Sequence, residues 1–277
     1  GVSAGYAEEL QLRTLVGYLI HPLVRRAFLI EHGCEKTHND YLRIELEKRG
    51  RDPQHFGWAS IQLDGGIEAV MRKVEDWFAR ELGADPVEEA TELGMESVCV
   101  GLLGTGELSK ESAAALRHVA ASIVSAGGTV IVPENAPFAY SEPFSALYSE
   151  SQPRPSLAYG AQPQQPGFHL METPTGHWVE TLTGLGAAGV GIMMAYMADR
   201  AEQGHPLVPV LRVSAHAEPM GHFEADLDLV LQGDTGSWGD SLLRLLADTA
   251  SHRYQPRVLA QRNTDFQLTR GLLGTSA

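Results

Sequence analysis

Residues 97–133 of the 277-residue chain read SVCVGLLGTGELSKESAAALRHVAASIVSAGGTVIVP. A short apolar run, a helical pattern and a second apolar run follow one another in this stretch. Ser109 is a good N-cap for the helix, and glycines at 127 and 128 are suited to end it. The order strand, helix, strand predicts two parallel strands joined by a right-handed crossover.

The same alternation extends to both sides of this unit. Helices are predicted over residues 40–49, 67–78 and 178–187 and after a cap at Ser237 or Asp240, and further strands over 27–30, 56–61, 168–171, 207–213 and 227–231. Residues 190–197 are a buried strand or a buried helix, which periodicity alone does not decide. The predicted fold class is α/β, with mostly parallel sheets and flanking helices in two α/β lobes.

The predicted boundary between the lobes is a segment rich in proline and glutamine. We expect an N-terminal α/β lobe over residues 1–148, a linker or loop over 149–166, and a C-terminal α/β lobe over 167–277.

Charge and composition exclude some classes of protein. Lys and Arg number 21 against 35 Asp and Glu, a formal charge of −14, so we expect no nucleic acid and no anionic membrane as a broad-surface partner, although a local anion pocket is allowed. No apolar run reaches the roughly 18–20 residues of a membrane span. Two cysteines and no visible signal peptide favour the cytoplasm. The first residue is Gly1, which is compatible with a piece of a longer chain.

One cluster of candidate metal ligands follows the first predicted strand. His32, Cys34, Glu35 and His38 fall within seven positions, and imidazole, thiolate and carboxylate are the side chains that bind transition metals. Their spacing matches no standard zinc motif. The alternative is an inert cysteine beside surface charges.

Candidate catalytic residues follow two later strands. Glu134 comes after the strand at 129–132 and is either a base or metal ligand, or a solvated loop residue. Residues 173–181 form a turn of small residues that leads into a helix, whose first N–H groups can hold a carboxylate or phosphate. His177 there is a candidate acid or base, and Glu180 either joins it or caps the helix through Thr175, Gly176 or His177. His205 is interpreted as a loop residue.

Several segments, in order, resemble the altronate and galactarate dehydratase family of sugar-acid dehydratases. Residues 21–35 resemble that family's HPN…GLGCE segment, and residues 127–134 its GGT…L-E segment. Further similar stretches are residues 166–171, 183–189, 206–213 and 262–266. Together they cover most of the chain.

The resemblance implies a cytoplasmic, metal-dependent hydro-lyase that acts on a small carboxylate substrate, a hydroxy or sugar acid. It places Cys34 and Glu35 at the family's Cys-Glu pair and Glu134 at one of its glutamates. A divalent metal, iron or manganese, would hold the enolate formed when a proton leaves the carbon next to the carboxylate.

Other positions depart from the family pattern. Val2 stands where the family has a cysteine, and a second cysteine is replaced within residues 101–107. By the resemblance, we also expect the family's front domain to be absent from this chain. Two alternatives therefore stay open: a divergent enzyme, or a non-catalytic binding or regulatory homologue. A homo-oligomer or a separate front-domain partner fits either.

Overall fold

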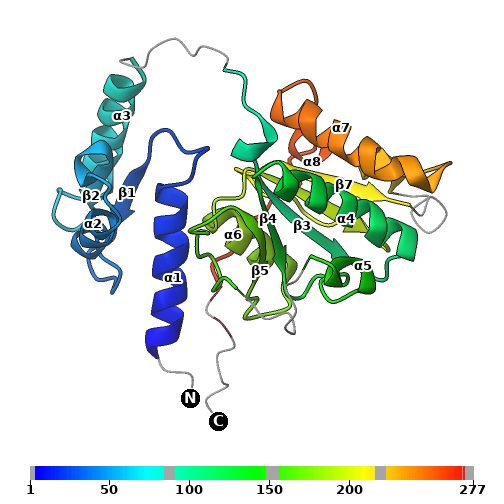
Figure 1. Cartoon of the computed structure of the whole chain (residues 1–277). Helices are drawn as coiled ribbons and strands as arrows, with labels where there is room; N and C mark the ends of the chain where they lie inside the picture. The colour runs from blue at the N-terminus through cyan, green and yellow to red at the C-terminus, as the bar shows by residue number, and fades with distance from the viewer. Residues whose placement is uncertain (1–3, 84–90, 148–155, 216–222, 270, 272–277) are drawn as a thin grey trace.

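The computed structural model describes residues 4–83, 91–147, 156–215, 223–269 and 271 (Figure 1). Over those ranges, no helix combines the length and the apolar character needed to cross a membrane.

A six-stranded parallel sheet forms the centre of the larger part of the molecule. Its order is β5-β4-β3-β6-β7-β8, and every neighbouring pair is parallel. The strands are β3 (Cys99–Thr105), β4 (Thr129–Pro133), β5 (Gly167–Met171), β6 (Ile192–Met197), β7 (Val210–Ser214) and β8 (Leu229–Val230). Residues 192–197 are thus a strand, and β7 begins just after Pro209, which cannot donate to the ladder. The predicted α/β class with parallel sheets is confirmed.

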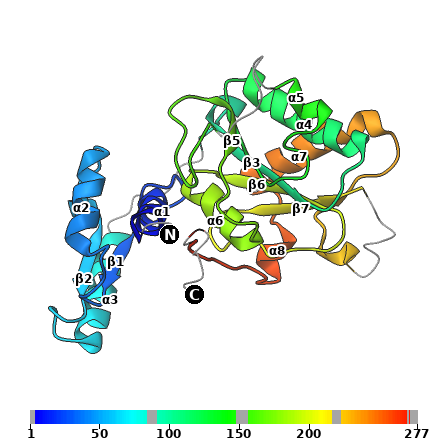
Figure 2. The same cartoon turned by 90° about the horizontal axis from the view of Figure 1, so that it is seen from below.

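Helices cover both faces of this sheet (Figure 2). One face packs against α4 (Lys110–Ser125) and α7 (Trp238–Ala250), and the other against α6 (Trp178–Ala187) and α8 (Arg257–Ala260). Ser109 caps α4 as predicted, because its hydroxyl accepts from the backbone N–H of Ser112 at 3.1 Å. The short elements are α5 (Glu142–Ser145), η2 (Met95–Ser97), η3 (Glu224–Asp226) and η4 (Thr235–Ser237).

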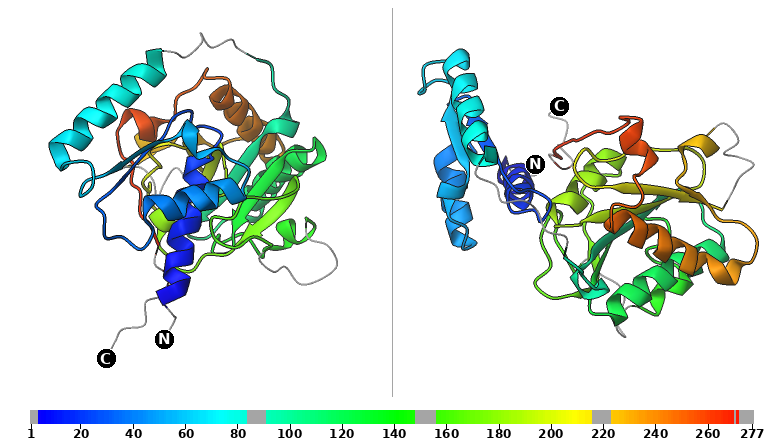
Figure 3. Two further views of the ribbon diagram at one scale, coloured as in Figure 1. Left: turned by 90° about the vertical axis from the view of Figure 1, so that its left-hand side faces the viewer. Right: turned by 90° about the horizontal axis from the view of Figure 1, so that it is seen from above.

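A smaller unit contains a separate two-stranded parallel sheet. Strands β1 (Phe28–Glu31) and β2 (Gly57–Ser60) are joined through α2 (Asn39–Lys48) and η1 (Pro53–His55), and α3 (Ile67–Gly83) follows. Leu42 and Leu46 of α2 are buried against Leu12 and Val16. The right-hand view of Figure 3 shows this unit as a body to one side of the large sheet.

The predicted division at residues 149–166 is wrong. Strand β4 pairs with β5 along its whole length, so strands from both sides of the predicted boundary share one sheet. Residues 148–155 lie outside the described residues, but Leu157 bridges to Met171 and Tyr159 is buried. The second half of the predicted linker is therefore part of the large unit, and the change from one sheet to the other falls after α3.

Helix α1 (Ala4–Leu19), which the sequence analysis did not predict, lies between the two units (Figure 2). It crosses α6 closely because each of the two helices has a glycine at the crossing. A Cβ at Gly17 would overlap the carbonyl oxygen of Ala187, and one at Gly186 would overlap the hydroxyl of Tyr18. Small residues thus let the two backbones approach.

A stack of aromatic rings fixes the end of α1 on the large unit. The ring of Tyr18 is parallel to that of His205 within 6° and to that of His21 within 16°, and Phe266 packs edge-on. The Nδ1 atom of His205 accepts from the N–H groups of Leu207 and Val208 at 3.1 and 3.0 Å, so the proton is on Nε2, 2.7 Å from the Tyr18 hydroxyl. Tyr18 in turn donates to the carbonyl of Thr183.

This arrangement holds both imidazoles in the neutral form. Burial, and then the neighbouring His21, lower the pKa of His205 to about 4, and burial also lowers the pKa of His21.

We expect Gly17→Ala to destabilise the protein by about 1–3 kcal/mol, because the new methyl group meets a backbone carbonyl that has little room to move. Gly83→Ala, at the end of α3 with open space around it, is the control, and its stability should stay within about 1 kcal/mol of the parent. Urea unfolding measures both. Equal effects of the two substitutions would contradict the close crossing.

We expect the free energy of unfolding to rise with pH between about 4 and 6.5 because of His205. In the unfolded chain its pKa is near 6.5, so in this window the unfolded chain binds more protons than the folded one. The contribution of His205, about 3 kcal/mol, is fully present above pH 6.5 and lost as the pH falls to about 4. NMR of the ring signals checks this, and a titration midpoint near 6.5 in the folded protein would contradict it.

Candidate functional site

The carboxyl edge of the large sheet is the natural place for a site. The chain adds β4 and β5 on one side of β3 and then β6 on the other, and ligands of such sheets bind outside the carboxyl ends where the strand order reverses. Glu134 follows β4, and His177 begins α6 after β5.

Glu134 joins the ends of two neighbouring strands. Its backbone N–H donates to the carbonyl of Met171, and its carboxylate accepts from the N–H and hydroxyl of Thr173 at 2.9 and 3.4 Å. The same carboxylate helps to raise the pKa of Tyr140, where burial is the larger cause. Glu134 is therefore an ordered residue of the edge.

The N-terminus of α6 lies above this edge. The Trp178 indole donates to the carbonyl of Gln203, in the loop after β6, at 2.8 Å, and the Asn135 amide donates to the Thr181 hydroxyl at 3.1 Å. Because β3 lies between β4 and β6, its carboxyl end falls between these two contacts. His177 is the N-cap residue, is exposed, and makes no capping hydrogen bond with its side chain.

Glu180 lies in the first turn of α6 and is buried. Its carboxylate accepts from the Thr175 hydroxyl and from the Gln267 amide, the latter at 3.0 Å. Thr175 is one of the capping partners weighed from the sequence, but its contact with Glu180 joins two side chains. The Thr175 hydroxyl also accepts from the backbone N–H of His177 at 3.4 Å. Glu180 thus links the turn at 173–177 to the C-terminal segment.

The sequence analysis missed Thr105, at the end of β3. Its hydroxyl oxygen is buried and has no hydrogen-bond partner among the described residues. The next residue, Gly106, has a φ of 63°, and a Cβ there would overlap Ala198 and Asp199, so the loops after β3 and β6 touch. The Gly-Thr-Gly run of residues 104–106 was the available signal, and it was noted only as a departure from the family pattern.

The predicted metal ligands lie elsewhere, in the turn after β1. The carboxylate of Glu35 accepts from the backbone N–H groups of His32, Gly33 and Cys34 at 2.6, 2.9 and 3.1 Å. These bonds, that of Gly33 first and then that of His32, lower the pKa of Glu35 to about 2. His38 caps α2, because its Nδ1 accepts from the N–H of Tyr41 at 3.3 Å.

Two of the four predicted ligands are therefore engaged in local turn structure. The side chains of Cys34 and His32 are in contact, with Sγ 3.4 Å from Nδ1. Within the part of the chain that the structure describes, no group of three or more His, Cys, Asp or Glu residues could hold a metal ion. The arrangement of this turn does not fit iron or manganese.

The two candidate clusters do not converge, because α1 lies between them (Figure 1). Lys36 of the turn forms an ion pair with Glu8 of α1 at 2.5 Å. Tyr6 of the same helix has its pKa raised by burial and then by the charges of Glu172 and, less strongly, Glu134. The Cys34 turn and the edge with His177, Glu180 and Glu134 are separate places.

No protein-family model matches the chain, and no curated protein matches it significantly. The resemblance to sugar-acid dehydratases therefore stays a prediction.

We expect the side-chain carboxyl of Glu35 to titrate with a midpoint around pH 2, because three backbone N–H groups stabilise its charged form. Carbon-detected NMR of the carboxyl signal measures this. A midpoint near the ordinary 4.5 would show that Glu35 is released from the turn and is open to other ligands.

Proposed function

We propose that the chain is a hydro-lyase that removes water from a hydroxy acid at the carboxyl edge of the large sheet. The observation that carries this proposal is the N-terminus of α6. His177 is the N-cap residue there, is exposed, and its side chain makes no capping hydrogen bond. The resemblance to sugar-acid dehydratases supports the same reaction class.

The chemistry assigned to this edge needs three groups. Backbone N–H groups in the first turn of α6 hold the substrate carboxylate and stabilise the negative charge that develops on it. His177 takes the proton from the carbon next to the carboxylate. The electron pair forms a carbon–carbon double bond, the bond to the neighbouring hydroxyl breaks, and a proton from an acid on the edge makes the leaving group water.

Glu134 and Glu180 are the carboxyl groups available as that acid. Glu134 is half-buried beside Thr173, and Glu180 is buried beside Thr175 and Gln267. Because the turn at 32–38 does not fit a metal ion, no step of the proposed reaction is assigned to one.

A second candidate function is a non-catalytic carboxylate-binding homologue. This function is favoured because the carboxylates of Glu134 and Glu180 already accept hydrogen bonds within the protein. Glu134 accepts two from Thr173, and Glu180 accepts one each from Thr175 and Gln267. Such a protein would hold its ligand at the N-terminus of α6 without turnover.

We expect the purified protein, assayed with and without added Fe²⁺ or Mn²⁺, to convert at least one sugar acid into the corresponding oxo acid. His177→Gln should lower kcat/KM by about 100-fold or more, because loss of a general base typically costs that much.

His118→Gln is the matched control, since His118 is exposed on α4, which covers the other face of the sheet. The binding homologue would be favoured if sugar acids bind to the parent protein, bind more weakly to His177→Gln, and are not converted in any condition. Full activity of His177→Gln would reject the proposed base.

A further inference from the structure

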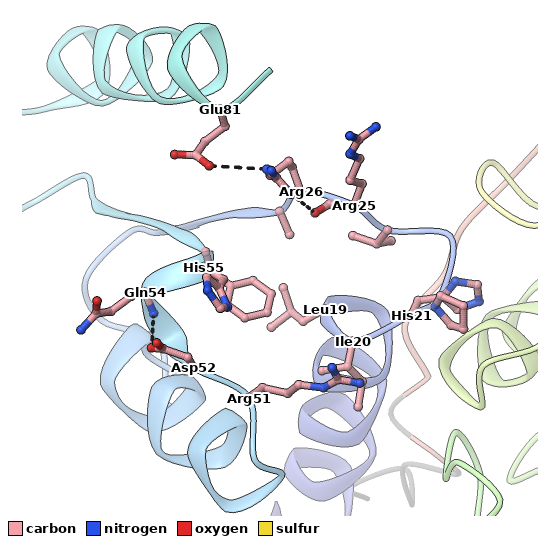
Figure 4. A pocket seen from close by; sticks show the side chains of 14 residues that line it. Leu19, Ile20, His21, Arg25, Arg26, Arg51, Asp52, Gln54, His55 and Glu81 are labelled. Carbon is pink, nitrogen blue, oxygen red and sulfur yellow. Dashed lines mark hydrogen bonds and ion pairs between the residues drawn. The ribbon is translucent and has the colours of Figure 1, made fainter. Parts of the chain in front are cut away.

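Two adjoining hollows lie beside the C-terminal end of α1, and the second of them also reaches the large unit. The first, of about 760 Å³, is lined by the end of α1, the segment that follows it and residues of η1 (Figure 4). The second, of about 510 Å³, lies between α1, the end of α2 and the loop at residues 160–164. Ile20 and Arg51 line both hollows, and we call them together the basic cleft.

The second hollow is lined by four cationic side chains and by no carboxylate: Arg13, Lys48, Arg49 and Arg51. Two nearby carboxylates offset part of this charge. Glu45 pairs with both Lys48 and Arg49, at 2.7 and 2.6 Å, and Glu9 pairs with Arg13. Four positive charges thus face two negative ones, in a chain whose formal charge is −14.

Arg51 stands out within this group. Its side chain is exposed, and the described residues offer its guanidinium neither a hydrogen bond nor an ion pair. In Figure 4 it extends alongside Ile20 in the wall that the two hollows share. A guanidinium presents a rigid fork of donors that suits carboxylate and phosphate oxygens.

Further polar groups complete the cleft. Arg25 and Arg26 line the first hollow on the side opposite Arg51, where Arg26 is 3.4 Å from Glu81 (Figure 4). Gln162 and Gln164 line the second hollow from the large unit. The first hollow is also lined by the carboxylates of Asp52 and Glu81, which balance Arg25 and Arg26 in charge. The excess of positive charge is therefore in the second hollow, which the amide groups of the large unit face.

We propose that the basic cleft binds a small polyvalent oxyanion, a molecule with two or more carboxylate or phosphate groups. The two uncompensated charges match a ligand of at least two negative charges. Each hollow has the size of small-molecule sites, about 300–1,000 Å³. A nucleic acid would meet the acidic remainder of the surface, whereas a small ligand meets the cleft alone.

This site is separate from the candidate active site. The cleft is bounded by the C-terminal half of α1, the end of α2 and the segments around η1, whereas His177 and Glu134 are at the carboxyl edge of the large sheet. A ligand in the second hollow contacts cationic side chains of α1 and α2 and amide groups of the large unit at the same time. Its binding therefore favours the placement of the two units in which these groups lie close together.

Isothermal titration calorimetry of the whole chain tests the proposal. The probes are pyrophosphate and tricarballylate, a tricarboxylate without a hydroxyl group, with acetate at matched ionic strength as the monovalent comparison. We expect one or both polyvalent probes to bind at one site and acetate to bind far more weakly. Pyrophosphate alone would identify a phosphorylated ligand, and tricarballylate alone a polycarboxylate.

Arg51→Gln should lower the affinity for the probe that binds by at least about tenfold, because a charge-assisted contact is lost. Arg72→Gln, which removes an exposed arginine of α3, is the matched control and should leave affinity within about twofold. Thermal melting checks that both variants fold. The proposal is overturned if neither polyvalent probe binds, if Arg51→Gln binds as tightly as the parent, or if both variants weaken binding equally.

Discussion

The close crossing of α1 and α6 is the contact on which the rest of this architecture depends. Gly17 and Gly186 remove the side chains that would separate the two helices. Tyr18 can then stack on His205 and donate to Thr183, which fixes the end of α1 on the large unit. Because Leu12 and Val16 of the same helix pack on α2, α1 also positions the small sheet, and with it the walls of the basic cleft.

Local patterns predicted most elements, but they did not predict how distant elements meet. Helix α6 was expected over residues 178–187 and has those bounds, and Ser109 caps α4 as expected. The domain boundary was wrong because a segment rich in proline and glutamine looks like a linker, whereas the pairing of β4 with β5 is a long-range contact. Helix α1 was missed because it is buried on two sides: Leu10 faces the large unit and Leu12 the small one, so its apolar residues form no single stripe.

The candidate site shows the same limit at the level of single side chains. The order of strands placed Glu134 and His177 at one edge, because residues after parallel strands share an edge. The turn at residues 32–38 does not fit a metal ion for a local reason: the backbone N–H groups of His32 and Gly33 donate to the carboxylate of Glu35, which the sequence pattern does not reveal. For Thr105 the only sequence signal was the Gly-Thr-Gly run of residues 104–106, since a buried hydroxyl without a partner is recognisable only once the fold surrounds it.

The neutral rings at the end of α1 have a consequence for how the protein responds to salt. Tyr18, His21 and His205 are held by stacking, burial and hydrogen bonds rather than by charge. Dissolved ions screen exposed charges strongly and such contacts weakly. Concentrated salt would therefore weaken the binding of an anion in the basic cleft, while the junction between α1 and the large unit stays intact. Ionic strength would thus control the occupancy of the cleft without controlling the stability of the fold.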